Sequence, residues 1–113
     1  MEKQVFVRRE RERWGLTQEE LATLLGLSRS SLSRVEAGIG VPDLPTAFGL
    51  QVIFGKSAHR LFPGLYTDVE ERVMRQGTRL DGLCTRLRTG AALLKQRLLS
   101  QMVGRVRNGF NCA

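Results

Sequence analysis

Apolar side chains recur every three or four residues along most of the chain, and glycines and prolines interrupt the first half at short intervals. This spacing is typical of amphipathic helices, and the interruptions divide residues 1–62 into segments of about ten residues each. Strand signals are poor, because the β-branched and aromatic clusters at 5–7 and 52–54 also fit helical spacing. We therefore expect an all-α protein that begins with several short helices.

Capping residues indicate where the first two helices begin and end. Good helix formers fill residues 4–13 and stop before Gly15, which predicts the first helix. Thr17 is followed three residues later by Glu20, a capping box that starts a second helix, and Gly26 ends it. Its buried stripe is expected to consist of Leu21, Leu24 and Leu25.

A third helix is predicted between Ser28, a good N-cap residue, and Gly38. Leu32 and Val35 are three residues apart and would face the core. The positions off that stripe are polar or basic: Arg29, Ser30, Ser33 and Arg34.

Two further caps predict a fourth and a fifth helix. Asp43 would cap residues 44–54, and Ser57 would cap a short helix that ends before Pro63. The fourth helix is expected to bury Leu44, Phe48 and Val52. We expect these five helices to form one domain at residues 1–64.

A longer apolar stripe follows from residue 68 to residue 106. Glycines in a helix interior each cost about 1 kcal/mol, so one long amphipathic helix and a helical hairpin broken near Thr89 and Gly90 both fit. We assign residues 65–107 to oligomerisation or partner binding, and 108–113 to a flexible tail. The stripe, which is the predicted dimer or partner face, comprises Val69, Val73, Leu80, Leu83, Leu87, Leu94, Leu98 and Met102.

The second and third predicted helices have the arrangement that places a helix in the major groove of DNA. A tight glycine turn joins them, and small polar and basic residues open the second one. Residues 16–38 read LTQEELATLLGLSRSSLSRVEAG. This run resembles the Xre family, which includes the phage Cro and repressor proteins, and the resemblance covers about residues 4–62. It implies a five-helix, repressor-like helix-turn-helix domain whose partner is double-stranded DNA.

The resemblance implies a recognition helix at about residues 28–37. Arginine can donate two parallel hydrogen bonds to guanine, which is worth roughly 1–3 kcal/mol of discrimination per base. Arg29 and Arg34 are therefore the expected base readers, and a solvated helix face is the alternative interpretation. The full set of predicted base contacts is Ser28, Arg29, Ser30 and Arg34.

Phosphate contacts and one structural pair also follow from the resemblance. Gln18 matches a glutamine that contacts phosphate from a helix N-terminus, where backbone N–H groups also attract anions. Glu36 and Arg11 match a pair with a structural role. The loop after Gly38 departs from many relatives, since it carries no basic residue. Further predicted phosphate contacts are Thr17, Ser31, Ser33 and Lys56.

The net charge of the chain indicates a polyanionic partner. The distribution of this charge leaves the role of the C-terminal half open. The 113 residues carry a net charge of +7, and residues 63–113 hold nine basic but only four acidic residues. No acidic residue follows Asp81. Three interpretations stay open: a solvated face opposite a dimer seam, extra phosphate contacts, or binding of an acidic protein or lipid surface.

The chain lacks the residues that catalysis or metal binding would need. His59 is the single histidine, and Cys84 and Cys112 have no metal-site spacing, so we expect two reduced thiols, no catalytic residues, no metal and no cofactor. No apolar run approaches the length of a membrane span, and the first residues do not resemble a signal peptide. We expect a cytoplasmic protein with no membrane contact.

These observations predict a sequence-specific DNA-binding transcriptional regulator, most simply a repressor, that binds a two-fold operator as a homodimer through residues 65–107. The alternative is an antitoxin-like adaptor whose residues 67–107 bind another protein. A regulator purified alone should be a stable dimer. An adaptor should expose its apolar stripe and aggregate until its partner arrives.

Overall fold

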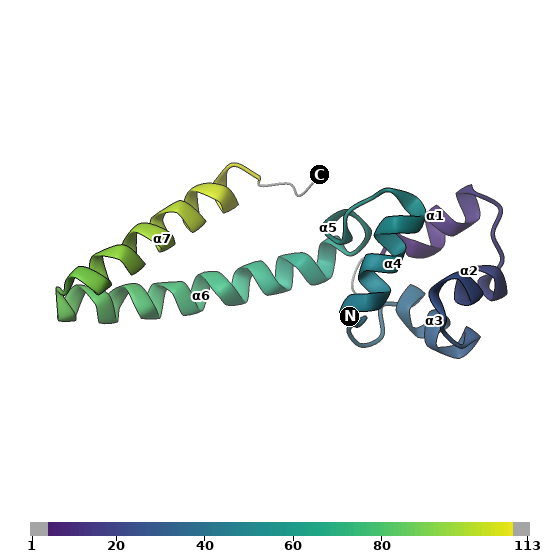
Figure 1. Ribbon diagram of the computed structural model, residues 1–113, viewed down its shortest axis with the longest axis horizontal. Coiled ribbons are helices and arrows are strands. Elements are labelled where there is room, and N and C mark those ends of the chain that lie inside the picture. The colour runs from purple at the N-terminus through teal and green to yellow at the C-terminus, as the bar shows by residue number, and fades with distance from the viewer. Residues whose placement is uncertain (1–4, 110–113) are drawn as a thin grey trace. The chain divides into compact units, whose positions relative to one another are not determined.

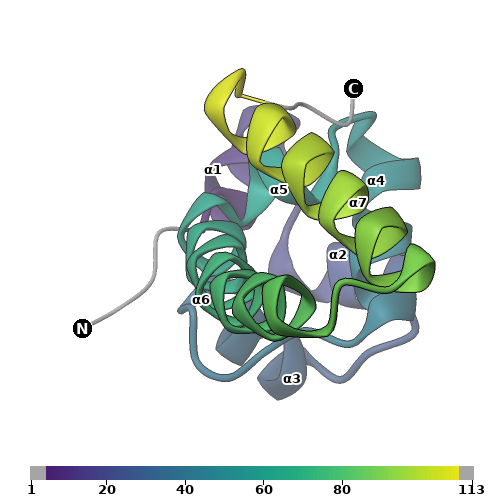
Figure 2. The same cartoon turned by 90° about the vertical axis from the view of Figure 1, so that its left-hand side faces the viewer.

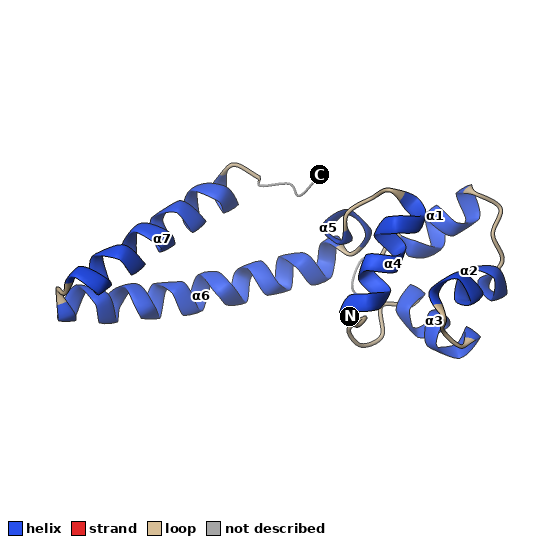
Figure 3. Ribbon diagram, viewed as in Figure 1, coloured by secondary structure: helices blue, strands red, loops and turns tan. Residues whose placement is uncertain are grey.

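The computed structural model describes residues 5–109, which form α-helices joined by short turns, with no strand among them (Figures 1 and 3). The all-α prediction is confirmed. The chain divides between Tyr66 and Thr67 into two compact units, called here the N-terminal unit and the C-terminal unit. The helices are α1 (Val7–Arg13), α2 (Gln18–Leu25), α3 (Arg29–Glu36), α4 (Leu44–Phe54), α5 (Ala58–Leu61), α6 (Pro63–Leu87) and α7 (Gly90–Arg107).

Local side-chain caps start the helices of the N-terminal unit. Thr17 Oγ1 accepts the Glu20 N–H at 3.1 Å, and Glu20 Oε1 accepts the Thr17 N–H at 2.9 Å, so the predicted capping box is present. Gly26 ends α2 with φ of 68°, a left-handed conformation that favours glycine. The N-caps of α3, α4 and α5 are Ser28, Asp43 and Ser57. Position 4, where the first helix was predicted to start, lies outside the described residues.

One hydrophobic core holds the five short helices together. Leu21 and Leu32 contribute to it as predicted, and Val35 packs against it. Full burial of such a side chain stabilises the fold by about 1.5–3 kcal/mol. The buried core residues are Val7, Leu21, Ala22, Leu32, Leu50, Leu61 and Phe62.

The predicted buried face of α4 is wrong. Leu44, Phe48 and Val52 are 64%, 57% and 83% exposed, and Leu50 is fully buried instead. Apolar residues occur all around this helix, so its periodicity does not select a face. The neighbouring helix decides it: α2 approaches α4 at Gly49, where a Cβ atom would lie 2.7 Å from Leu25 Cδ2.

The predicted stripe of α2 needs one correction of the same kind. Leu24 is exposed, whereas Leu21 is fully buried and Leu25 packs against the core. Ala22 takes the buried position that was assigned to Leu24. The core-facing side of α2 therefore includes the small residue Ala22, which lets α2 lie close to the helices that pack against it.

The C-terminal unit is a helical hairpin, one of the two alternatives that the sequence left open. Figures 1 and 2 show α7 turning back along α6. The break falls at Arg88, which has a positive φ of 49°, and at Thr89, whose Oγ1 accepts the Ala92 N–H at 3.0 Å. Pro63 is the first residue of α6, a position where its missing N–H is tolerated.

One close packing contact and one hydrogen bond join α6 and α7. A Cβ atom at Gly77 would lie 2.9 Å from Met102 Cε, so glycine there lets α7 come near α6. Closer to the turn, Gln96 Nε2 donates to Thr85 Oγ1 at 3.0 Å. Residues 110–113, which include Cys112 and most of the predicted tail, lie outside the described residues.

The break means that the predicted stripe does not continue as one face. Val73, Leu80 and Met102 line an apolar groove between α6 and α7. Leu94 and Leu98 are instead largely exposed, as are Leu83 and Leu87. Both α6 and α7 therefore carry members of the stripe that line the groove and members that are exposed.

Candidate nucleic-acid interface

The α2–α3 turn leaves one side of α3 facing outward. The Leu27 N–H donates to Ala22 O at 2.9 Å, and Ser28 then caps α3, so only three residues join the two helices. Leu32 is the fully buried residue of α3 and anchors the helix to the core. The residues on the other side of α3 are exposed.

All four predicted base-contact residues are exposed: Ser28, Arg29, Ser30 and Arg34. The Arg34 guanidinium has no hydrogen bond or ion pair with any residue in the described range 5–109. Ser28 is already engaged, because its Oγ accepts the Ser31 N–H and lies 2.9 Å from Ser31 Oγ. The most available hydrogen-bond donor on this side of α3 is thus Arg34.

Glu36 is the centre of a polar network that joins three helices. Its carboxylate accepts hydrogen bonds from Arg11 Nε at 2.7 Å, Arg11 Nη2 at 3.2 Å and Gln18 Nε2 at 3.0 Å. Arg11 Nη1 also donates to Leu16 O at 2.8 Å. The Glu36 side chain is only 3% exposed, so this pair is largely shielded from water. The arrangement ties α3 to α1 and α2, which is the structural role that the resemblance implies.

Gln18 extends this network to the recognition helix. Its Oε1 accepts from Arg29 Nε at 3.4 Å, while Arg29 Nη1 lies 3.6 Å from Glu19 Oε1. Both Arg29 and Glu19 are mostly exposed, and exposed ion pairs are worth little, about 0–1 kcal/mol. Arg29 can therefore leave this position for a base or a phosphate at small cost. Sequence reasoning missed the Gln18 bridge, because its partners are 11 and 18 residues away.

The start of α2 lies in a shallow concavity that is lined by basic residues and by Glu19. Its lining includes three arginines and the residues that begin the helix: Arg8, Arg11, Thr17, Gln18 and Arg29. The Thr17 backbone N–H, which donates to the Glu20 carboxylate, lowers the pKa of that group, and the Thr17 hydroxyl adds to the effect. Glu20 therefore keeps its charge at neutral pH and preserves the cap.

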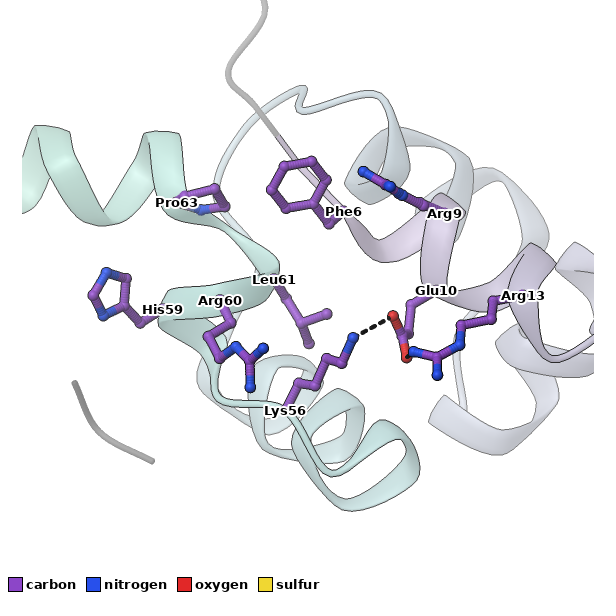
Figure 4. Close-up of a pocket in the computed structure, with 9 residues that line it drawn as sticks. All are labelled: Phe6, Arg9, Glu10, Arg13, Lys56, His59, Arg60, Leu61 and Pro63. Atoms are coloured by element: carbon purple, nitrogen blue, oxygen red, sulfur yellow. Dashed lines mark hydrogen bonds and ion pairs between the residues drawn. The ribbon is translucent and has the colours of Figure 1, made fainter.

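The remaining phosphate candidates do not all lie together. Ser31 and Ser33 are exposed on α3, near the predicted base readers in sequence. Lys56 lies elsewhere, since its Nζ donates to Glu10 Oε2 at 2.8 Å in a pocket beside α1 and α5 (Figure 4). The structure therefore does not bring Lys56 to the α2–α3 surface.

Residues 5–109 contain neither a metal-ligand cluster nor a membrane-spanning helix. No group of three or more His, Cys, Asp or Glu side chains there is placed to hold a metal ion. Within the same range, no helix is long and apolar enough to cross a membrane.

The comparisons with known proteins bear on the N-terminal unit. A family model of helix-turn-helix domains matches residues 7–61, which contain α1 to α5. No curated protein and no solved structure matches the chain. The matched region contains the exposed α3 and the Glu36 network described above. Residues 7–61 therefore belong to the Xre-like helix-turn-helix family of DNA-binding transcription regulators.

Proposed function

We propose that the protein is a repressor that binds a two-fold DNA operator as a homodimer, with α3 in the major groove. The observation that carries this proposal is the outward side of α3, where Arg34 has no partner within the described chain and Arg29 has only weak ones. A buried leucine and the Glu36 network hold the helix in place. Rigid support of this kind favours specific contacts, because little order must be gained on binding.

The C-terminal unit supports the dimeric part of the proposal. Among its described residues only Cys84 and Ala92 are buried, while leucines such as Leu83, Leu94 and Leu98 are more than half exposed. Apolar surface of this extent on a small helical unit marks an interaction site. A second copy of the hairpin would bury it and would set two recognition helices on half-sites about 34 Å apart, one turn of DNA.

Base reading is tested by selecting binding sites from random DNA with the wild type, Arg34→Ala and Arg97→Ala. Arg97 is an exposed arginine of α7, so its replacement is matched in charge. Arg34→Ala should weaken the preferred site by about 1–3 kcal/mol and relax the preference at one base of each half-site. Arg97→Ala should leave the preference unchanged. Identical preferences for Arg34→Ala and the wild type would contradict the proposal.

Dimerisation is tested by sedimentation of the wild type and of two variants. Leu94→Gln combined with Leu98→Gln should shift the dimer toward monomer, because it places amide groups in the proposed apolar interface. Phe48→Gln, on the exposed side of α4, is the control and should remain dimeric. A monomeric wild type at micromolar concentration, or a dimer lost only in Phe48→Gln, would exclude the hairpin as the interface.

An antitoxin-like adaptor is the second candidate function, and the same exposed leucines support it. If the hairpin binds a different protein, the purified chain should expose apolar surface and aggregate. A dye that binds apolar surface distinguishes the two candidates. Low dye binding with a stable dimer supports the repressor, and high dye binding with aggregation supports the adaptor.

A further inference from the structure

A second cationic site lies on the N-terminal unit, away from the start of α2. α1, α5 and the turn between α4 and α5 enclose a half-open pocket of about 670 Å³ (Figure 4). We call it the cationic pocket and define it by its charged side chains, Arg9, Glu10, Arg13, Lys56 and Arg60. Its volume lies within the range of roughly 300–1,000 Å³ that small-molecule sites occupy.

This pocket holds more positive charge than the rest of the unit. Residues 5–66 contain eight basic and six acidic residues, and the pocket takes four of the basic residues but only Glu10 of the acidic ones. The other residues of that range are thus left with four basic and five acidic side chains. The excess positive charge of the described N-terminal unit is therefore concentrated at this pocket, and not on α3.

Two of the four cations are already neutralised in part by Glu10. Lys56 Nζ donates to Glu10 Oε2 at 2.8 Å, and Arg13 Nη1 lies 3.6 Å from Glu10 Oε1. Lys56, helped by Trp14 and Arg13, lowers the pKa of Glu10 despite its burial. Glu10 therefore stays ionised at neutral pH, and one carboxylate serves two cations.

The other two cations have no acidic partner among residues 5–109. Arg60 forms no hydrogen bond or ion pair through its guanidinium with any residue the structure describes, and Arg9 lies over the Phe6 ring at 5.9 Å. Figure 4 shows both guanidinium groups at the pocket together with the Phe6 ring. Planar guanidinium groups bind phosphate oxygens with two parallel hydrogen bonds. The pocket thus offers two guanidinium groups that can bind phosphate oxygens, and its five charged side chains together carry a net charge of +3.

We propose that the cationic pocket binds a small phosphate-bearing anion, and that this site is separate from the DNA-reading surface. A multivalent anion matches the charge excess better than a single carboxylate does. A straight DNA duplex seated on α3 is not the occupant, since Figures 1 and 2 show α3 toward one side of the N-terminal unit and α1 and α5 toward the other. The phenyl ring of Phe6 adds an apolar wall to the pocket beside the guanidinium groups of Arg9 and Arg60.

Calorimetric titration with inorganic pyrophosphate at constant ionic strength tests the proposal on the full chain. The pocket variant combines Arg9→Gln with Arg60→Gln, and the control combines Arg86→Gln with Arg97→Gln, which removes the same charge from exposed positions of α6 and α7. The wild type and the control should bind pyrophosphate with sub-millimolar affinity. The pocket variant should bind at least about tenfold more weakly, since each lost charge-assisted hydrogen bond is worth that factor or more. Circular dichroism verifies that both variants are folded.

Three results would overturn the proposal. The first is no heat of binding in the wild type at millimolar pyrophosphate. The second is an equal loss of affinity in the control, which would indicate a general charge effect. The third comes from DNA binding: if the pocket variant lowers the slope of log K against log salt by about 0.9 for each arginine, these side chains contact DNA phosphates instead. An unchanged slope supports a separate anion site.

Discussion

The two units of this protein bury apolar side chains to very different extents. In the N-terminal unit, seven apolar residues from five helices and the turn after α5 form one core, and none of them is more than 4% exposed. In the described C-terminal unit, burial is limited to Cys84 and Ala92. The N-terminal unit therefore has an internal source of stability, whereas the described hairpin leaves most of its large apolar side chains exposed.

The number of helices explains this difference. Short helices that meet around a common centre can enclose it, because each covers the apolar stripes of the others. Two helices of a hairpin cover only the stripe that each presents to the other, so apolar residues on the flanks stay in water.

The largest expected effect is the loss of the buried ion pair in the N-terminal unit. Arg11→Met leaves the Glu36 carboxylate shielded and without its cation, which should lower the free energy of unfolding by about 3–5 kcal/mol. Urea unfolding followed by fluorescence of Trp14, the single tryptophan, reports on this unit. Arg8→Met is the control, because its bridge to Glu12 is exposed and such pairs contribute little to stability. Equal losses in both variants would show that burial of the pair has no special role.

The next effect concerns the two sides of α4. Leu50→Ala removes a fully buried side chain and should destabilise the N-terminal unit by about 2–5 kcal/mol. Phe48→Ala removes a larger but mainly exposed side chain and should cost about 1 kcal/mol or less. The same urea titration measures both. A greater loss for Phe48→Ala would mean that α4 faces the core as its sequence first predicted.

A smaller effect is expected in the C-terminal unit from the cap of α7. Thr89→Ala removes the hydroxyl that accepts the Ala92 N–H and should weaken α7 by about 1 kcal/mol. Amide hydrogen exchange should become faster in α7 and stay unchanged in α1 to α5, because α7 lies in a separate compact unit from the core of α1 to α5. Thr78→Ala is the control, since that hydroxyl donates to Met74 O inside α6 and caps no helix. Faster exchange throughout both units would contradict their independence.

The smallest effect is a pH dependence that originates in the N-terminal unit. Its carboxyl groups Glu10, Glu20 and Asp43 have lowered pKa values, because Lys56, Thr17 and Thr46 respectively donate hydrogen bonds to them. A carboxyl group whose pKa is lower in the folded state than in the unfolded state stabilises the fold at pH values above its unfolded-state pKa. This stabilisation is lost as the pH falls through the folded-state pKa. The urea midpoint should therefore be constant near neutral pH and fall below about pH 4.5.

Glu10→Gln isolates one contribution to this dependence. The variant should show a shallower fall of the urea midpoint in acid, because the side chain that Lys56 keeps ionised no longer titrates. Glu12→Gln, on the exposed side of α1, is the matched control. An identical acid profile for the wild type and Glu10→Gln would assign the dependence to other groups.

Much of the N-terminal unit could be predicted because its signals are local. A cap needs only a side chain and an N–H three residues later, so Thr17, Ser28, Asp43 and Ser57 mark the starts of helices in sequence and in structure alike. The positive-φ glycine at Gly26 is equally local. The position of the helix-turn-helix within the chain follows from these signals.

The orientation of each helix was decided by tertiary contacts. α4 has apolar residues all around, so its own sequence is consistent with either Phe48 or Leu50 inside, and the approach of α2 at Gly49 selects Leu50. Glu10 and Lys56 are 46 residues apart, and only folding makes them partners in the cationic pocket. Helix ends depend on neighbours in sequence, whereas buried faces and charge clusters depend on neighbours in space, which a single amphipathic pattern does not specify.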